Sequence, residues 1–381
     1  MNDTTPAETP QVKGWCPGAL RPMMSGDGLV VRIKPFGGRL RRAQADGLAT
    51  LASAHGNGLI DLSSRGNIQI RGVTEQAHPR LLAGLRHMSL LDPTPEVERR
   101  RNILVTPFWL TGDETEALAP ALAELLGRPE APDLPHKFGF AVDTGRKPVL
   151  QTASADIRME CDAGGGLILV ADGAAVGKPV TSQTIVAEAL ALADWFMAHR
   201  GDANRMAALL ESGQPLPPGH FVPRQVQDYV PRPGFTPLGA MVGLAFGQMK
   251  VETLASLAKH GGLRMTPWRM LLVESARRLP EVEGIITDPE DPLLRVVACT
   301  GAPRCAQGHV NTHDTARALA PHLPDGSFLH VSGCTKGCAH PRPAPLTVVG
   351  TPDRLDLVRD GRPGDAPDRT SLSPDDIIKA F

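Results

Sequence analysis

The sequence predicts a mixed α/β (α+β) fold assembled from two related halves. Short apolar runs alternate with helical segments along the chain, which is typical of sheets covered by helices. Gly58 lies seven residues before Arg65, Gly262 lies seven residues before Arg269, and an apolar run follows each arginine. A proline-rich stretch, 213–234, separates the two occurrences and has the composition of a connector. The length of 381 residues also favours two or three domains.

The first half is expected to alternate between helix and strand. A helix should end near Ala54, where His55-Gly56-Asn57-Gly58 interrupts the pattern. Two strands should follow, because apolar residues recur over 59–62 and from Ile68 onward. A short apolar run at 102–105 predicts a third strand, and 114–126 has the pattern of a helix.

The second half is expected to repeat this order. The expected elements are helices at 253–259 and 312–319, strands at 271–273, 294–298 and 328–331, and a last helix at 374–380 with Ser373 as its N-cap. The matching order of elements in the two halves favours a real duplication over a chance similarity.

Composition excludes several classes of function. The net charge is −1 and aromatic residues make up 4% of the chain, which argues against nucleic acid as the main partner and against a polybasic membrane site. Residues 1–14 lack the apolar core of a secretory signal. The apolar segment 185–197 is interrupted by Glu188 and Asp194. We therefore expect a cytoplasmic protein without membrane contact.

Four of the six cysteines fall within forty residues. Cys299 and Cys305 form a C-x5-C pair, and Cys334 and Cys338 form a C-x3-C pair after 28 further residues. Each pair follows a predicted strand, so the strand ends should hold the side chains in fixed positions. In a reducing compartment such clusters point to metal or catalysis rather than disulfides. Soft thiolates favour an iron–sulfur cluster or zinc.

An iron–sulfur cluster fits these spacings better than zinc does. Zinc ribbons prefer C-x2-C pairs, and the glycines at 301, 333 and 337 would let backbone N–H groups approach cluster sulfurs. A structural zinc site and unliganded cysteines remain alternatives. Cys16 is isolated and is expected to be partly buried, and Cys161 lies in a strand-like segment and is expected in the core.

The cysteine arrangement resembles that of the sulfite and nitrite reductase family, and the resemblance covers nearly the whole chain. In that family the four cysteines hold a 4Fe–4S cluster, and the last one bridges to sirohaem iron. The resemblance implies a duplicated architecture with paired ferredoxin-like halves and two mixed α/β repeats. The implied parts are a first half at 15–80, a first repeat at 90–212, a linker at 213–234, a second half at 235–285, and a second repeat with the cysteines at 290–381.

Three further motifs carry the same resemblance. The segment 64–69, Ser-Arg-Gly-Asn-Ile-Gln, is similar to the family strand whose arginine binds anions, which implies that role for Arg65. Arg101-Asn102-Ile103 resembles an R-N-V motif whose arginine lines the same pocket, and Lys137 matches the first active-site lysine. The resemblance therefore implies Arg65, Arg101 and Lys137 as catalytic residues. A second family lysine is replaced by Gly139, which puts reduction of sulfite or nitrite in doubt.

A closer match exists to a branch of the family that acts in aerobic cobalamin biosynthesis. The segments 16–20, 25–29 and 332–341 carry it. In this branch dioxygen supplies a hydroxyl group to the meso carbon between rings A and D of precorrin-3A, and a γ-lactone closes. The branch implies an iron–sulfur centre with an associated mononuclear non-haem iron. A sirohaem-dependent sulfite or nitrite reductase remains the alternative, and a non-enzymatic electron carrier is a third interpretation.

The tetrapyrrole substrate carries many carboxylates, so its site should contain fixed cations, preferably guanidinium groups. Candidate substrate-binding residues from the first half are Arg21, Arg32, Arg65, Arg71, Arg101 and Lys137, whereas Arg99 and Arg100 resemble surface charges. His309, His313 and His340 are weak candidates for iron ligands. The segment 164–166 is not a phosphate-binding loop, so an external reductase is expected to supply electrons.

Overall fold

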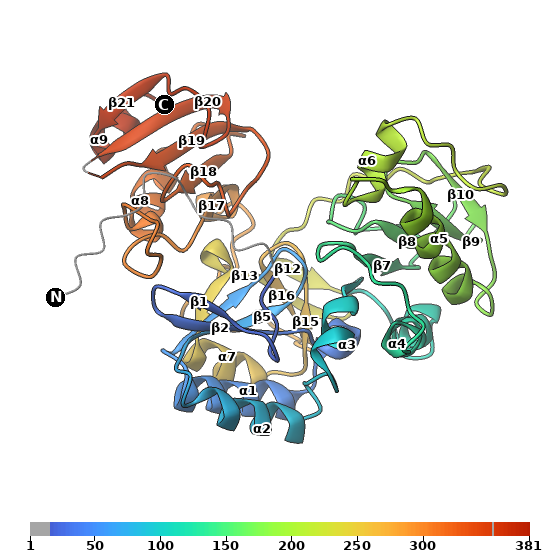
Figure 1. Cartoon of the computed structure of the whole chain (residues 1–381). Coiled ribbons are helices and arrows are strands. Elements are labelled where there is room, and N and C mark those ends of the chain that lie inside the picture. Colours follow the sequence, from blue (N-terminus) through green and yellow to red (C-terminus); the bar gives the residue numbers. More distant parts are fainter. Residues whose placement is uncertain (1–15, 353) are drawn as a thin grey trace.

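The computed structural model describes residues 16–352 and 354–381, and its strands form four sheets. Figure 1 shows three lobes: a central body in blue and yellow, a green lobe on one side, and an orange to red lobe on the other. The expectations for residues 1–14 and Trp15 lie outside the described residues. The predicted mixed α/β fold is confirmed.

The central body contains two five-stranded sheets with matching strand order. The first sheet runs β1 (Met23–Ser25), β2 (Gly28–Ile33), β5 (Ile68–Val73), β4 (Leu59–Leu62) and β14 (Gln248–Lys250). The second runs β12 (Gly234–Thr236), β13 (Gly239–Gly243), β16 (Met270–Glu274), β15 (Leu263–Met265) and β3 (Arg39–Leu40). The repeated spacing in the sequence therefore corresponds to a repeated hairpin, β4–β5 and β15–β16.

The two sheets exchange their outermost strands. β14 comes from the second half of the chain but pairs with β4, with Gln248 opposite Asp61. β3 comes from the first half but pairs with β15, with Arg39 opposite Arg264. Because neither sheet is complete without the other half, the two halves form one structural unit.

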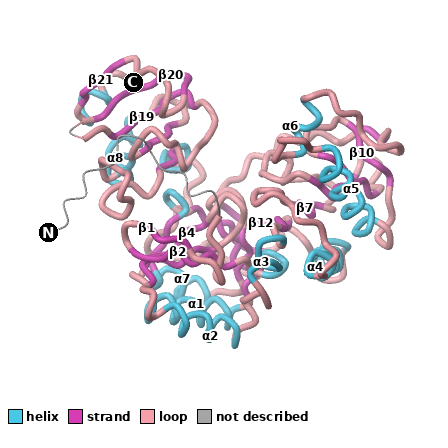
Figure 2. Tube along the Cα trace, viewed as in Figure 1, coloured by secondary structure: helices cyan, strands magenta, loops and turns pink. Residues whose placement is uncertain are grey.

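Helices cover one side of this body, as Figure 2 shows beneath the strands. They are α1 (Arg42–His55), α2 (His78–His87) and α7 (Val251–Ala258), with short 3-10 turns η1 (Phe36–Gly38) and η2 (Ala245–Gly247). α1 packs against both α2 and α7. One apolar core includes Leu48 of the first half and Leu257 of the second, so burial of apolar surface stabilises the two halves together.

The green lobe holds a six-stranded sheet. Its order is β11 (Val222–Pro223), β10 (Val176–Pro179), β9 (Leu167–Ala171), β8 (Ile157–Cys161), β7 (Phe140–Asp143) and β6 (Ile103–Val105). Its helices are α3 (Pro95–Arg100), α4 (Glu114–Gly127), α5 (Ile185–His199) and α6 (Met206–Glu211). β6, β7 and β8 are parallel, and the other strands pair antiparallel.

The orange to red lobe has the same pattern with five strands. Its order is β17 (Val296–Ala298), β18 (Leu329–Ser332), β19 (Ala344–Gly350), β20 (Leu355–Gly361) and β21 (Arg369–Leu372). Its helices are α8 (Thr312–Leu319) and α9 (Pro374–Ile378), with 3-10 turns η3 (Pro292–Arg295) and η4 (Ala320–His322). β17, β18 and β19 are parallel, and the rest are antiparallel. α8 joins β17 to β18 as α4 joins β6 to β7.

Several elements differ from the sequence expectations. The strand expected over 294–298 is limited to β17, because Pro292 opens a 3-10 turn that the Asp291 side chain caps. The connector 213–234 contains β11, which pairs with β10, so part of the connector belongs to the sheet of the green lobe. The last helix ends at Ile378, and the predicted N-cap Ser373 accepts a hydrogen bond from the Asp376 amide.

In residues 16–352 and 354–381, no helix combines the length and hydropathy that crossing a membrane requires.

Candidate functional site

The four clustered cysteines lie at one edge of the sheet in the orange to red lobe. Cys299 directly follows β17, and Cys334 follows β18 after Gly333. β17 and β18 are neighbouring parallel strands, so their carboxyl ends meet at the same edge. Cys305 and Cys338 lie in the loops that continue from these ends. The strand pairing therefore places the two cysteine pairs at the same edge of the sheet.

The thiol groups influence one another electrostatically. Burial raises the pKa of Cys299, and the charges of Cys305 and Cys334 raise it further. Burial likewise raises the pKa of Cys338 to about 11, with contributions from the other three thiols. Because such effects fall off with distance, they agree with four thiols that lie at one edge of the sheet.

Among the described residues, no group of three or more His, Cys, Asp or Glu side chains is placed to hold one metal ion. A single zinc ion draws four sulfurs into a tight tetrahedron, whereas a four-iron cube spreads its ligands more widely.

Glycines shape the two loops around these thiols. The Gly333 amide donates a hydrogen bond to Cys299 Sγ at 3.2 Å, so a backbone N–H group does reach a sulfur. Gly301 has a φ of +60°, and a Cβ atom there would lie 2.5 Å from Thr312 Oγ1. A side chain at position 301 would force the Cys299–Cys305 loop away from α8.

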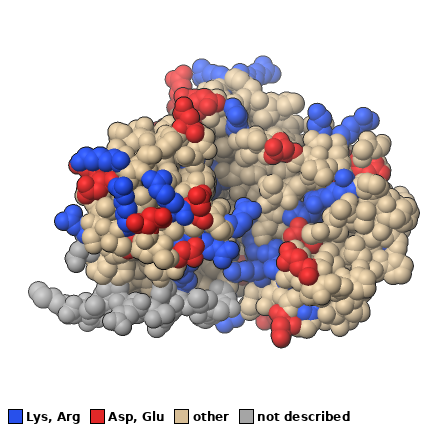
Figure 3. All heavy atoms as spheres, turned by 90° about the horizontal axis from the view of Figure 1, so that it is seen from above, with Lys and Arg blue, Asp and Glu red and all other residues tan. Residues whose placement is uncertain are grey.

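A cationic cavity of about 110 Å³ lies between the first half of the central body and the green lobe. Five of its side chains are cationic and two are acidic: Arg21, Arg32, Lys34, Arg65 and Arg99 against Glu96 and Glu98. Asn102, His136 and Cys16 also line it. Figure 3 shows lysine and arginine side chains gathered around a hollow between the outer lobes. The excess of positive charge is suited to an anionic ligand.

Two arginines in this cavity form no salt bridge in the part of the chain that is described, although the charges of Glu98 on Arg32 and of Asp156 on Arg65 act on them. Arg32 donates to Gln69 Oε1 from Nε at 3.1 Å and from Nη2 at 2.7 Å. Arg65 reaches only Ser154 Oγ, at 3.5 Å. Burial lowers the pKa of both guanidinium groups. A partly buried cation without a counter-charge is costly, and a bound carboxylate would relieve that cost.

Arg71 and Arg101, which the sequence also predicted at the substrate site, are paired with carboxylates of the chain. Arg71, 4% exposed, donates to Asp27 at 2.7 Å and to Asp61 at 3.1 Å. Arg101, 5% exposed, binds both Asp92 oxygens at 2.6 and 2.7 Å. These carboxylates occupy both guanidinium groups and hold them within the fold. Their roles in substrate binding and, for Arg101, in catalysis stay predictions.

Some of the remaining predicted residues lie at the cationic cavity. Arg21 is exposed and lines the cationic cavity with Arg32 and Arg65. Lys137 is also exposed, and the residue before it, His136, lines the cavity. Cys161 is buried and donates to Thr144 O, in agreement with its expected place in the core.

The sequence did not single out Lys34 as a candidate site residue. Its side chain is 8% exposed and lines the cavity. Nζ donates to Glu98 O at 2.5 Å and to Asn102 Oδ1 at 2.7 Å. Burial and the charge of Arg101 lower its pKa to about 7. The only signal in the sequence was a lysine placed directly after the apolar strand 28–33 and before a proline.

A row of polar side chains crosses the first sheet from the cavity to the cysteine loops. Arg32, Gln69, Asp61 and Gln248 lie opposite one another on β2, β5, β4 and β14. Gln248 donates to Asp61 at 2.7 Å and accepts from Arg304 at 3.2 Å. Arg304 precedes Cys305, and three strand spacings amount to roughly 14 Å. The row therefore links the cationic cavity to the cluster loops.

The three histidines considered as iron ligands do not gather at one point. The His313 ring stacks on Phe246 with centroids 4.6 Å apart, and burial lowers its pKa to about 4. The His340 ring lies 5.1 Å from Phe328. His309 is tied through its amide to Gly333 O. No mononuclear iron site emerges from them.

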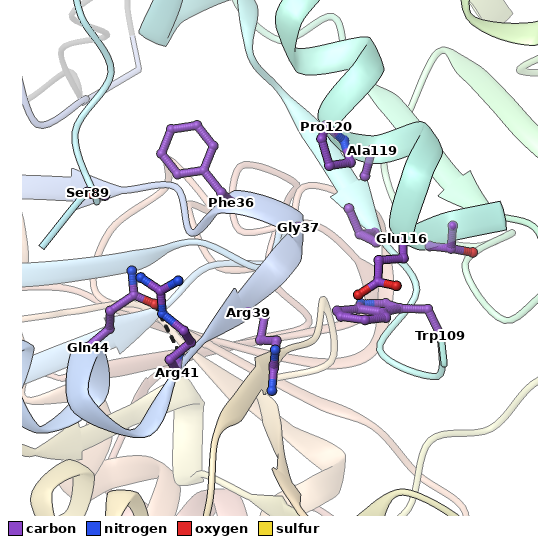
Figure 4. Close-up of a pocket in the computed structure, with 12 residues that line it drawn as sticks. Phe36, Gly37, Arg39, Arg41, Gln44, Ser89, Trp109, Glu116, Ala119 and Pro120 are labelled. Atoms are coloured by element: carbon purple, nitrogen blue, oxygen red, sulfur yellow. Dashed lines mark hydrogen bonds between the residues drawn. The ribbon is translucent and has the colours of Figure 1, made fainter. Parts of the chain in front are cut away.

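A second cavity, of about 430 Å³, lies between η1 and α4 (Figure 4). Its lining is largely apolar, with Phe36, Trp109 and Pro120, and Arg39 is among its few charged residues. None of the clustered cysteines lines it. The cationic groups and the clustered thiols therefore lie at the other cavity and in the cysteine loops.

Residues 21–88 match a family model for the nitrite/sulfite reductase ferredoxin-like half domain. The chain is 30% identical to a precorrin-3B synthase from a Sinorhizobium species, over 92% of this chain and 83% of that protein. It is 24% identical to the ferredoxin–nitrite reductase of Synechococcus elongatus, over 88% of this chain and 78% of the relative. The solved structure of the Mycobacterium tuberculosis NirA protein matches with a TM-score of 0.60 at 18% identity, covering 85% and 71% of the two chains.

Replacing Arg101 should destabilise the fold. Arg101→Ala leaves the Asp92 carboxylate buried without a counter-charge, and we expect the free energy of unfolding to fall by about 3–5 kcal/mol. The exposed pair of Arg128 with Glu124 provides a matched control, and Arg128→Ala should cost about 0.5 kcal/mol or less. Chemical denaturation measures both. Equal stability of the two variants would contradict the structural role of Arg101.

Lys34 should make stability depend on pH. Between its folded-state pKa of about 7 and its ordinary value of 10.5, the unfolded chain binds a proton that the folded chain does not. The free energy of unfolding should therefore rise with pH above 7, relative to Lys34→Met. Denaturation of both proteins at pH 7, 8 and 9 tests this, and parallel pH profiles would count against the lowered pKa.

Proposed function

This chain belongs to the precorrin-3B synthases, a branch of the nitrite/sulfite reductase family, and we propose that it hydroxylates precorrin-3A with dioxygen in cobalamin biosynthesis. One oxygen atom enters the meso carbon between rings A and D, and a ring A acetate closes a γ-lactone. The second oxygen atom leaves as water, which requires two electrons and two protons from outside the substrate. An external reductase would supply the electrons.

The observation that carries this proposal is the pair of arginines without carboxylate partners. Precorrin-3A is a flat macrocycle surrounded by carboxylates, and guanidinium groups bind carboxylates through two parallel hydrogen bonds. Arg32 and Arg65 present such groups in one cavity, with Arg21 on the same lining. The polar row that extends from Arg32 offers further hydrogen-bonding groups along the sheet. These groups would orient the macrocycle rather than react with it.

We propose Cys299, Cys305, Cys334 and Cys338 as ligands of a 4Fe–4S cluster. Two features support the fit: the mutual influence of the four thiols and the Gly333 amide aimed at Cys299 Sγ. Such a cluster, when bound, supplies single electrons at low potential. We assign no residues to a mononuclear iron.

Two lysines would have different roles at the site. Lys34 Nζ lies on the lining of the cavity and, with a pKa of about 7, can hold or release a proton there near neutral pH. Lys137 would approach the ligand from the exposed side, next to His136. Arg65 is proposed to bind a carboxylate close to the reacting ring.

The decisive experiment supplies reconstituted protein with precorrin-3A, a reductant and ¹⁸O₂. We expect a product with one labelled oxygen atom from dioxygen, and no product without oxygen. Cys334→Ser should lose iron, acid-labile sulfide and turnover together. A sirohaem Soret band, with reduction of sulfite or nitrite and no labelled product, would instead establish the reductase, which the match to a nitrite reductase keeps as the second candidate.

Arg65→Ala should weaken binding of the tetrapyrrole and leave the cluster in place. Loss of one charge-assisted contact of about 1.5–3 kcal/mol corresponds to roughly a 10- to 100-fold rise in Kd. Anaerobic titration with precorrin-3A measures the affinity, with Arg128→Ala as an unchanged control. Loss of iron from the Arg65 variant would contradict the separation of the two sites.

A further inference from the structure

We propose that Arg269 positions the loop of Cys338 and compensates the negative charge of the centre held by Cys299, Cys305, Cys334 and Cys338. The inference deepens the proposed function and rests on one part of it, that these cysteines hold an iron–sulfur cluster. It assigns a role to an arginine that the duplication singled out and that the proposed reaction does not use.

Arg269 is the counterpart of Arg65 in the second half. Arg65 lies in the turn between β4 and β5, and Arg269 lies in the turn between β15 and β16. The first turn faces the green lobe through Ser154, and the second faces the orange to red lobe through Ala339. The duplication has therefore placed one arginine at each of the two lobes.

The backbone at Arg269 is strained. Its φ is +60°, a left-handed conformation that is uncommon for a residue with a side chain. Such conformations cost on the order of 1–3 kcal/mol and persist only where surrounding contacts hold them. Here the strained turn directs the guanidinium towards the cysteine loops.

The contact of Arg269 is with the backbone beside the fourth cysteine. Nη2 donates to Ala339 O at 3.2 Å, and Ala339 directly follows Cys338. This bond joins residues 70 positions apart in the chain. It ties the end of the Cys334–Cys338 loop to the rigid hairpin of the central body.

Arg269 is half-buried, and unlike the fully buried arginines it lacks a counter-charge. Arg71, Arg101, Arg158 and Arg264 each pair with a carboxylate. Within residues 16–352 and 354–381, no carboxylate pairs with Arg269. Its surroundings resemble those of Arg32 and Arg65, which face the proposed ligand site.

The neighbourhood of Arg269 is positive or neutral. Burial lowers its pKa to about 10, so it stays charged at neutral pH. His330 is completely buried, neither of its ring nitrogens has a hydrogen-bond partner, and Arg269 is among the charges that lower its pKa. A half-buried cation without a counter-charge is costly, and a neighbouring anion would reduce that cost. A four-iron cluster with four thiolates is an anion and becomes more negative on reduction.

The test compares reduction potentials, which need no substrate. Removing the positive charge in Arg269→Gln should favour the oxidised cluster. We expect at least a tenfold fall in the ratio of reduced to oxidised cluster at fixed solution potential, equivalent to 59 mV for one electron. Arg269→Lys keeps the charge and should stay close to the wild type. Redox titration followed by electron paramagnetic resonance measures the potential, and iron and sulfide analysis measures occupancy.

Arg295 provides the matched control. It also donates to a backbone carbonyl, Pro324 O, at 2.7 Å, and it belongs to the same lobe. It precedes β17, at the opposite end of the sheet from the cysteines. Arg295→Gln removes the same charge far from the thiols and should leave the potential unchanged.

The possible outcomes separate the two proposals. A wild type without iron and sulfide would refute the cluster, and this inference with it. A fully loaded Gln variant with the wild-type potential would overturn the role of Arg269 alone, even if its affinity for the tetrapyrrole falls. Loss of the cluster from the Gln variant but not from the Lys variant supports the role of the charge, whereas loss from both refutes it.

Discussion

The exchange of outermost strands between the two central sheets is the constraint on which the rest of the structure depends. β14 completes the sheet of the first half and β3 completes the sheet of the second, so the hairpins β4–β5 and β15–β16 are held in fixed relation. The turns of these hairpins carry Arg65 and Arg269. The outer lobes attach to this body, and each receives one arginine from it. The positions of the cavity and of the cysteine loops therefore follow from the pairing of two short strands.

Carboxylate partners distinguish the arginines that hold the fold from those that face a ligand. Arg71 and Arg101 are surrounded by aspartates and are fully used within the protein. Arg32, Arg65 and Arg269 reach only neutral oxygens among the described residues. An unpaired cation is costly to bury. Arg32, Arg65 and Arg269 therefore indicate where an anion from outside the chain would bind. For Arg32 and Arg65 this place is the cavity, and for Arg269 it is the surroundings of the thiols.

The sequence was informative about local order and about the cysteines, because strand and helix patterns and the spacing of thiols are short-range features. It predicted β4, α4 and α8 closely, and it predicted that Cys299 and Cys334 follow strands. It could not show that Asp92 lies against Arg101 or that Asp27 lies against Arg71, since pairing depends on tertiary contacts. In the sequence Lys34 is an ordinary residue at the end of a strand. Its place in the cavity follows from tertiary contacts, because its ammonium group donates to Glu98 O and to Asn102 Oδ1. The exchange of strands between the two sheets could not be predicted from the sequence, because β3 has only two residues.

The polar row across the first sheet has a thermodynamic consequence. Arg32 at one end belongs to the cavity, and Arg304 at the other end precedes Cys305, with Gln69, Asp61 and Gln248 between them. Arg32 is hydrogen-bonded to Gln69, and Gln248 joins Asp61 to Arg304, while Gln69 and Asp61 lie opposite each other on neighbouring strands. A change of charge at one end therefore alters the electric field along the row. Any such coupling is reciprocal: a ligand that prefers the reduced protein must also make the protein easier to reduce, by the same free energy. Ligand binding in the cavity and reduction of the protein are then thermodynamically linked, and each changes the free energy of the other by the same amount.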